Sequence, residues 1–256
     1  RVRVRVRVRV RVRVRVGVRV SVRVNHAALL LEGLAALEAL RLHVRGRQAV
    51  AGRVPLTIKL RRGFDDEQGS EDSFFRIIEE TIEQGYFAAT VHGRTVRQKY
   101  EGPSRWSFLT GLTRRYPDFR IMGSGDIFTP ESVFEMISST GVDAVSIARG
   151  AIGNPWVFHQ AACLLEGEPP RPPSLQEQGS VLREHFELCS RFHTEKKTQR
   201  LMRKFGIKFS VHHPEPEKAE KAFISCRSQD DWWDVFERLY CDAAIEASEI
   251  PGTGTA

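Results

Sequence analysis

The chain has 256 residues, 41% of them hydrophobic, which is enough for one α/β barrel or for a smaller core with a helical domain. Its formal net charge of +7 would suit a nucleic-acid-binding protein. However, ten of the 39 basic residues lie in residues 1–24, and the other 29 are outnumbered by 32 acidic residues, a net charge of −3. Residues 25–256 are therefore not basic as a whole, so any nucleic-acid-binding surface on them must be a local patch.

Cysteine usage and hydropathy exclude further classes. The four cysteines are far apart and form no CxxC pair, which argues against a zinc site or a disulfide framework. No apolar run is long enough to span a membrane, and the first residues lack the apolar region of a signal peptide. We expect a cytoplasmic monomer with no metal and no membrane partner.

Residues 1–24 are an almost pure Arg-Val repeat. As one strand it would extend about 80 Å, whereas a globule of this chain length has a radius of gyration of about 18 Å. We therefore interpret it as a low-complexity tail with no fixed structure in isolation. The alternatives are a polybasic arm for RNA, an anchor for an anionic surface, and a translated DNA repeat or wrong gene start. Residues 25–53 have Leu and Ala at helical spacing and are predicted as an uncertain helical segment.

From residue 54 to residue 168, strand-like and helix-like stretches alternate. Four such repeats predict parallel strands with right-handed crossovers, which is half of a (β/α)8 TIM barrel or a small doubly wound sheet. The predicted strands are 54–60, 87–91, 119–122 and 144–148, and the predicted helices are 70–84, 104–116, 130–140 and 156–165.

A proline-rich linker, 168–173, separates this α/β part from an all-α C-terminal domain, 174–247. Ser174 and Glu177 have the spacing of a capping box, which predicts that a helix begins there. Residues 251–256 are expected to be frayed. His212-His213-Pro214 is too isolated to predict a metal site. Trp232-Trp233 is predicted to pack inside the helical domain, with base stacking as the alternative.

Polar groups and glycines follow the predicted strands, where α/β barrels have their active sites. Small residues allow backbone N–H groups to approach a phosphate, and a following helix N-terminus favours an anion. Ordinary loop glycines are the alternative. The last two strands end in loops of this kind, Gly123-Ser124-Gly125-Asp126 and Ala148-Arg149-Gly150.

Three more polar side chains lie at the ends of the earlier predicted strands. Lys59 and Arg61 lie on the same side of the first predicted strand, and a lysine there can stabilise an anionic reduced cofactor. A salt bridge at the rim is the alternative. His92 follows an apolar run and could hydrogen-bond a cofactor ring or a substrate carbonyl, although a structural hydrogen bond would also explain it.

The order and spacing of these motifs resemble the tRNA-dihydrouridine synthases. That family consists of FMN-dependent oxidoreductases with a TIM barrel and a C-terminal helical domain that helps to hold tRNA. The resemblance covers residues 54–245, and residues 1–53 show no family motif. The motifs are Pro55-Leu56-Thr57-Ile58-Lys59-Leu60-Arg61, Thr90-Val91-His92-Gly93-Arg94-Thr95, Gln98-x-Tyr100-x-Gly102-Pro103 with Trp106, Gly123-Ser124-Gly125-Asp126-Ile127, and Ala148-Arg149-Gly150-Ala151-Ile152-Gly153-Asn154-Pro155-Trp156.

The resemblance implies a reaction and roles for individual residues. NADPH would reduce FMN, flavin N5 would give a hydride to C6 of a flipped-out uridine, and an acid would protonate C5. Two positions depart from the family pattern: the family has Asn where this chain has Ser124, and Gly where it has Ala148. The residues implied to bind FMN are Lys59, His92, Gly123, Ser124, Gly125, Asp126, Ala148 and Arg149.

The family's acid is a Cys in an Asn-x-Gly-Cys-Pro loop, and this sequence has no such motif. We therefore assign no catalytic residue and expect that the chain as written could be inactive. The alternatives are a tRNA-binding remnant without catalysis and another FMN- or phosphate-binding TIM-barrel oxidoreductase that acts on a small molecule.

A dense run of basic residues in 191–221 fits the tRNA-holding domain through neutralisation of phosphates. A solvated helix face is the alternative reading. The residues that we expect to contact the tRNA substrate are Arg61, Arg94, Lys197, Arg200, Arg203, Lys204 and Lys208.

Overall fold

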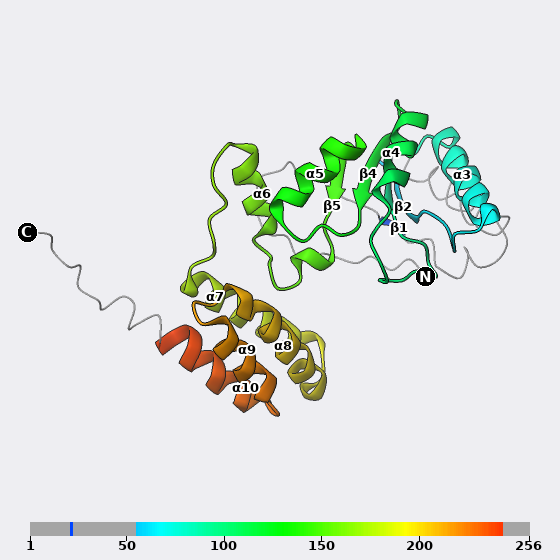
Figure 1. Cartoon of the computed structure of the whole chain (residues 1–256). Coiled ribbons are helices and arrows are strands. Elements are labelled where there is room, and N and C mark those ends of the chain that lie inside the picture. Colours follow the sequence, from blue (N-terminus) through cyan, green and yellow to red (C-terminus); the bar gives the residue numbers. More distant parts are fainter. Residues whose placement is uncertain (1–20, 23–54, 243–256) are drawn as a thin grey trace, which may run out of the picture. The chain divides into compact units, whose positions relative to one another are not determined.

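The structure is a computed structural model that describes residues 21–22 and 55–242 (Figure 1). The predictions for residues 25–53 and for 251–256, and most of those for the Arg-Val tail, lie outside the described residues. Two residues of the tail, Ser21 and Val22, lie within the described part. Ser21–Val22 forms strand β1 and pairs in parallel with β2 (Thr57–Arg61). An uncovered strand edge offers free backbone hydrogen-bonding groups, and valine has a high strand propensity.

The chain divides into two compact units. The first runs to Ile127 and includes Glu131–Ala148, and the second consists of Phe128–Pro130 and the residues from Arg149 onward. None of the described helices is both long and apolar enough to cross a membrane.

The first unit is a parallel sheet in the order β1-β2-β3-β4-β5, and one described helix lies between each pair of successive strands from β2 to β5. This confirms the predicted α/β class, and the elements begin and end within three residues of their predicted limits. The last strand is shorter than predicted because the chain turns into the 3₁₀ helix η1 after it. The elements are β2, α3 (Gln68–Glu83), β3 (Ala88–His92), α4 (Trp106–Arg115), β4 (Arg120–Ser124), α5 (Pro130–Thr140) and β5 (Ala144–Ser146).

Side-chain alternation gives the sheet one apolar face. Ile58 and Leu60 of β2 are buried at 3% exposure, and Ala89 and Val91 of β3 are fully buried in the same core as Ile121 of β4. The alternate positions of the strands therefore face the other way, and they carry the polar residues described below. The helices contribute the rest of the core, including Phe74, Ile78, Leu109, Leu112 and Met136.

The second unit is helical and has its own core. Trp232 is fully buried and stacks on Phe236, with 5.4 Å between ring centroids, while Trp233 packs edge-on against both rings. This confirms that the two tryptophans pack inside the helical unit. The elements are η1 (Arg149–Ala151), α6 (Val157–Leu165), α7 (Leu175–Phe192), α8 (Glu195–Phe209), η2 (Ser210–His212), α9 (Pro216–Ser225), α10 (Gln229–Phe236) and the π-helical turn η3 (Glu237–Asp242).

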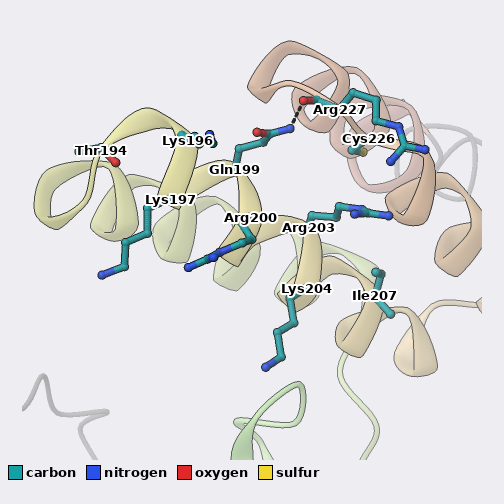
Figure 2. A pocket seen from close by; sticks show the side chains of 10 residues that line it. All are labelled: Thr194, Lys196, Lys197, Gln199, Arg200, Arg203, Lys204, Ile207, Cys226 and Arg227. Carbon is teal, nitrogen blue, oxygen red and sulfur yellow. Dashed lines mark hydrogen bonds between the residues drawn. The ribbon is translucent and has the colours of Figure 1, made fainter.

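Local signals explain where these helices begin. Ser174 accepts a hydrogen bond from the backbone N–H of Glu177, whose carboxylate accepts one from the N–H of Ser174, so the predicted capping box is confirmed. Ser228 and Asp231 form a second capping box at the start of α10. Between them, α8 turns an apolar side to the core and a basic side outward (Figure 2).

Candidate functional site

Four polar residues form a row across the carboxyl ends of the strands. The strand register pairs Arg61 with His92, His92 with Ser124, and Ser124 with Ser146. Paired residues of neighbouring strands point to the same face of a sheet, so the row lies on the face opposite the apolar core. Lys59 is exposed on this face, one pleat before Arg61. Sequence reasoning missed Ser146, because a serine within a short apolar run carries no signal of its own.

His92 is the titratable group of this row. Burial, together with the positive charges of Arg61, Arg94 and Lys59, lowers the pKa of its imidazole to about 4, and Asp126 opposes this effect only in part. The ring is therefore neutral at pH 7 and can both donate and accept a hydrogen bond. Because its folded pKa lies below its unfolded value, this group destabilises the fold increasingly as the pH falls from about 6.5 towards 4.

Arg94 and Asp126 join the loops that follow β3 and β4. The guanidinium donates to both carboxylate oxygens of Asp126, at 2.7 and 2.8 Å, and to the carbonyl of Gly102 at 2.5 Å. Asp126 also accepts the backbone N–H of Ser104 at 2.7 Å. Arg94 is only 3% exposed, so most of its N–H donors are used in these bonds, which we call the Arg94 fork. Its expected contact with substrate, and that of Asp126 with FMN, stay predictions.

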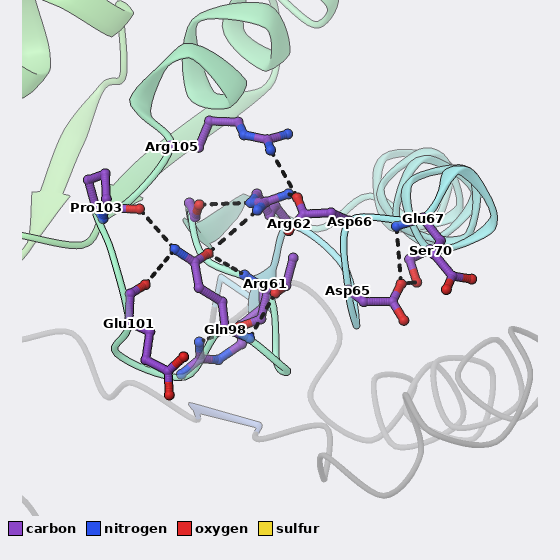
Figure 3. A network of polar contacts seen from close by, with 12 residues as sticks. Arg61, Arg62, Asp65, Asp66, Glu67, Ser70, Gln98, Glu101, Pro103 and Arg105 are labelled. Atoms are coloured by element: carbon purple, nitrogen blue, oxygen red, sulfur yellow. Dashed lines mark hydrogen bonds and ion pairs between the residues drawn. The ribbon is translucent and has the colours of Figure 1, made fainter.

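A second buried arginine, Arg62, holds the same loop from the side of β2 (Figure 3). Its Nε donates to the carbonyl of Gly93 at 3.0 Å, and its guanidinium pairs with Asp66 at 2.6 Å. Gln98 donates to two further loop carbonyls, those of Glu101 and Pro103. Sequence reasoning missed Arg62, because it follows Arg61 directly and nothing in the local pattern marks it as buried at 5% exposure.

The two glycines of the predicted phosphate loop differ in their surroundings. A Cβ at Gly123 would lie 2.5 Å from Met136 Sδ, so this glycine is explained by packing against the helices. Gly125 has a φ of +123°, and a Cβ there would lie 2.8 Å from the His92 ring. Only Gly125 therefore has its conformation and its space set by the strand-end site.

The expected phosphate loop after β5 is divided between the units. Ala148 is exposed and ends the first unit, while Arg149 belongs to the second, where its guanidinium lies 5.3 Å from the ring of Phe128. The end of the same motif has a packing role. A Cβ on Gly153 would lie 2.8 Å from the carbonyl oxygen of Lys208, and Trp156 packs edge-on against Phe209 at 5.6 Å.

The two neighbouring histidines are both accounted for by protein contacts. His212 Nε2 lies 2.9 Å from the carbonyl of Gly153. His213 Nδ1 accepts the backbone N–H of Glu215, so its Nε2 donates to the carbonyl of Leu239. No group of three or more His, Cys, Asp or Glu residues within the described ranges is arranged to hold a metal ion.

A basic groove with a volume of about 720 Å³ lies along α8 in the second unit. Figure 2 shows Lys197, Arg200 and Lys204 projecting from the same side of the helix. Arg203 also lines the groove, but it donates to the carbonyl of Ile224 at 2.7 Å and so fixes the end of α9. None of the lining residues, all in the described part of the chain, is acidic. They are Thr194, Lys196, Lys197, Gln199, Arg200, Arg203, Lys204, Ile207, Cys226 and Arg227.

The groove unites four of the predicted tRNA contacts and adds Lys196 and Arg227. Lys208 is not among the lining residues. The two phenylalanines of α8 belong to the hydrophobic core of the second unit. Phe209 is 2% exposed, and the partly buried Phe205 packs against the same core.

Residues 27–230 match the family model for dihydrouridine synthase (Dus). The chain belongs to the Dus family. It is 31% identical over 199 residues to a probable tRNA-dihydrouridine synthase of Mycobacterium leprae, an alignment that covers 75% of this chain and 51% of that protein. It is also 31% identical over 196 residues to the tRNA-dihydrouridine synthase B of Xanthomonas axonopodis pv. citri, covering 76% and 58% respectively. The chain thus spans about half the length of the curated relatives that it matches.

The extent of the Dus match corrects one expectation. It begins at residue 27, so the prediction that the whole of residues 1–53 is unlike the family is wrong for residues 27–53. That stretch contains none of the motifs that carry the resemblance from residue 54 onward.

Proposed function

We propose that this chain is the FMN- and tRNA-binding part of a tRNA-dihydrouridine synthase. The observation that carries the proposal is the row of hydrogen-bonding residues at the strand ends of a Dus-family sheet, flanked by Lys59. Its relatives in Mycobacterium leprae and Xanthomonas bear the name of this activity.

The groups present at the strand ends fit FMN. The ligand carries a phosphate and several ring carbonyls, and the row offers the cationic or donor groups of Lys59, Arg61, His92 and Ser124. The carboxylate of Asp126, which would repel a phosphate, is neutralised by the Arg94 fork. Lys59, His92, Ser124 and Gly125 would hold the cofactor in the first unit, with Ala148 of the same unit as a further contact.

When bound, FMN supplies a hydride for the C5=C6 bond of uridine, and NADPH is the reductant. The chain's own residues hold the reactants. Lys59 provides the positive charge that favours an anionic reduced ring, and neutral His92 donates or accepts at a ring or uracil heteroatom. The forks of Arg62 and Arg94 keep the intervening loop in place. We assign no proton donor to this chain.

The groove on α8 is the proposed tRNA contact. Lys196, Lys197, Arg200 and Lys204 can each neutralise a backbone phosphate, which supplies most of the affinity for nucleic acid without reading its sequence. Arg203 contributes chiefly by keeping α8 and α9 together.

Flavin titration of the purified chain tests the cofactor site. We expect saturable quenching of FMN fluorescence, and a roughly tenfold or greater loss of affinity in Lys59→Ala, because a hydrogen bond to a charged group contributes about 1.5–3 kcal/mol. Arg120→Ala removes an exposed cation at the opposite end of β4 and serves as the matched control. Mass spectrometry of unmodified tRNA incubated with FMN and NADPH then shows whether uridine gains two hydrogens. A chain that neither binds FMN nor reduces uridine overturns the proposal.

A second function, tRNA binding without reduction, is favoured by one observation. The basic groove is complete within the helical unit, whereas the sequence contains no Asn-x-Gly-Cys-Pro loop. Retention of tRNA by a chain that does not quench flavin fluorescence would support this function over the first.

A further inference from the structure

Two buried polar atoms at the strand ends have no hydrogen-bond partner among the described residues. They are Nε2 of His92 and Oγ of Ser104. A buried polar group left unsatisfied is destabilising, so native structures pair such groups directly or through water. Two of them at one place therefore need an explanation.

Both side chains approach the same point in space. That point is the place where Gly125 would carry a Cβ, 2.3 Å from Ser104 Oγ and 2.8 Å from His92 Cδ2, the ring carbon bonded to Nε2. Gly125 has no Cβ, so nothing of its own side chain separates the hydroxyl from the ring edge. A Cβ on Gly93 would likewise lie 2.7 Å from Ser104 Oγ. The two glycines thus make room for the serine hydroxyl.

The backbone of Ser104 is held firmly in this position. Its N–H donates to Asp126, which is itself gripped by Arg94. The next residue, Arg105, donates its N–H to the carbonyl of Gly93 at 2.9 Å. With the backbone anchored on both sides, the remaining freedom of Ser104 is rotation of its hydroxyl, and the residue itself is 8% exposed.

We propose that Ser104 is a positioning residue for His92: its hydroxyl pairs with Nε2, directly or through one buried water, and selects the tautomer of the ring. The other ring nitrogen, Nδ1, is then left to bind the ligand in the strand-end row. Only this last step rests on the proposed function.

The need for such a partner follows from the surroundings of the ring. Burial, and then the positive charges of Arg61, Arg94 and Lys59, lower the pKa of the imidazole and keep it neutral. A neutral imidazole has two tautomers, which present either a donor or an acceptor at a given nitrogen. A fixed hydroxyl at Nε2 makes one of them dominant, so the ligand meets a ring of defined polarity.

Nitrogen-15 NMR of the histidine rings in the cofactor-free chain at pH 7 tests this proposal. In the wild type, the two ring nitrogens of His92 should show well-separated shifts, one typical of N–H and one of a bare nitrogen. In Ser104→Ala the tautomer ratio should change at least about fivefold, the effect of one net hydrogen bond. Ser107→Ala, which removes an exposed hydroxyl in the first turn of α4, should leave the ratio unchanged.

Either of two results overturns the proposal: averaged ring shifts in the wild type, or the same tautomer ratio in Ser104→Ala and the wild type. The first of these needs no variant, so the proposal stays testable if Ser104→Ala does not fold. Because the measurement is made without FMN, a failure of the proposed cofactor binding would not alter its outcome.

Discussion

Two buried arginines organise the strand ends at the scale of single residues. Arg62 and Arg94 donate mainly to loop carbonyls and to aspartates, and Arg61 donates to the carbonyl of Thr95 at 2.9 Å. Arginine suits this task, because its planar fork can serve a carboxylate and a carbonyl at once. These three arginines therefore hold the loop that follows β3, while Lys59 is exposed on the face of the sheet that carries the row.

Arg94→Ala should destabilise the first unit by about 3 kcal/mol, since it leaves the partly buried Asp126 and the carbonyl of Gly102 without their donor. Arg97→Ala is the matched control, because Arg97 is 71% exposed and lies 3.5 Å from Asp65. Its loss should stay below about 1 kcal/mol. Hydrogen exchange of the β3 and β4 amides measures both effects, and equal losses would show that the fork does not hold the loop.

At the scale of the element, α8 has two faces with separate tasks. Met202 and Phe209 are at most 2% exposed and pack into the core of the second unit. Lys197, Arg200 and Lys204 follow one another at helical spacing on the outside. The positive groove is thus carried by a helix whose position is set by its buried side, so the cations keep a constant spacing.

Replacing both Lys197 and Arg200 by Gln should weaken tRNA binding and reduce the dependence of log K on log salt concentration by about 1.4–1.8, which corresponds to two phosphate contacts. Lys218 and Lys221 on α9 pair with Glu215 and with Glu217 and are exposed. The same double change there should leave the slope as it is. Filter-binding or fluorescence titrations over a range of salt concentrations provide the slopes, and an unchanged slope in the first variant would remove the groove from the tRNA contact.

At the scale of the whole molecule, each unit has a core of its own. The motif from residue 148 to residue 156 begins with the last residue of the first unit and continues in the second. Ala148 ends the first unit. Inside the second, Gly153, with a φ of +93°, allows the end of α8 at Lys208 to come into contact with the loop, and His212 donates to the carbonyl of Gly153. The glycine therefore joins the segment that starts at Arg149 to the helical bundle.

Gly153→Ala should destabilise the second unit by about 3 kcal/mol, of which about 1 kcal/mol is backbone strain and the rest is the overlap with Lys208. Gly167→Ala separates the two causes. Gly167 has a similar φ of +82°, but a Cβ there would meet no atom within 4 Å, so only the strain remains. Urea titration followed by tryptophan fluorescence reports the difference, and equal losses would show that close approach to α8 is not important.

Local patterns in the sequence predicted the elements well, because their signals lie within a few residues. The capping box of Ser174 and Glu177, the proline that begins α5 and the apolar strand of β3 are examples. The position of His92 at a strand end followed from the same reasoning.

What the sequence did not predict depends on partners far apart in the chain. Arg94 meets Asp126 only because the register of β3 and β4 brings their loops together. Gly123 and Gly153 have the composition of a phosphate loop, yet their neighbours Met136 and Lys208 come from other elements. A glycine needed for packing and one needed for a ligand are identical in sequence, and only the fold distinguishes them.

The fork between Arg94 and Asp126 also imposes an order of events during synthesis. Its two residues are 32 positions apart, which at 5–20 residues per second corresponds to roughly two to six seconds of translation. During that interval the loop from Gly93 to Ser104 has only contacts made by residues that precede β4, such as those of Arg62 and Gln98. Its ion pair and its backbone bond to Asp126 form only after β4 has been made. The strand-end site is thus completed late in translation, and a chain stalled between these positions has the β3 loop without its bonds to Asp126.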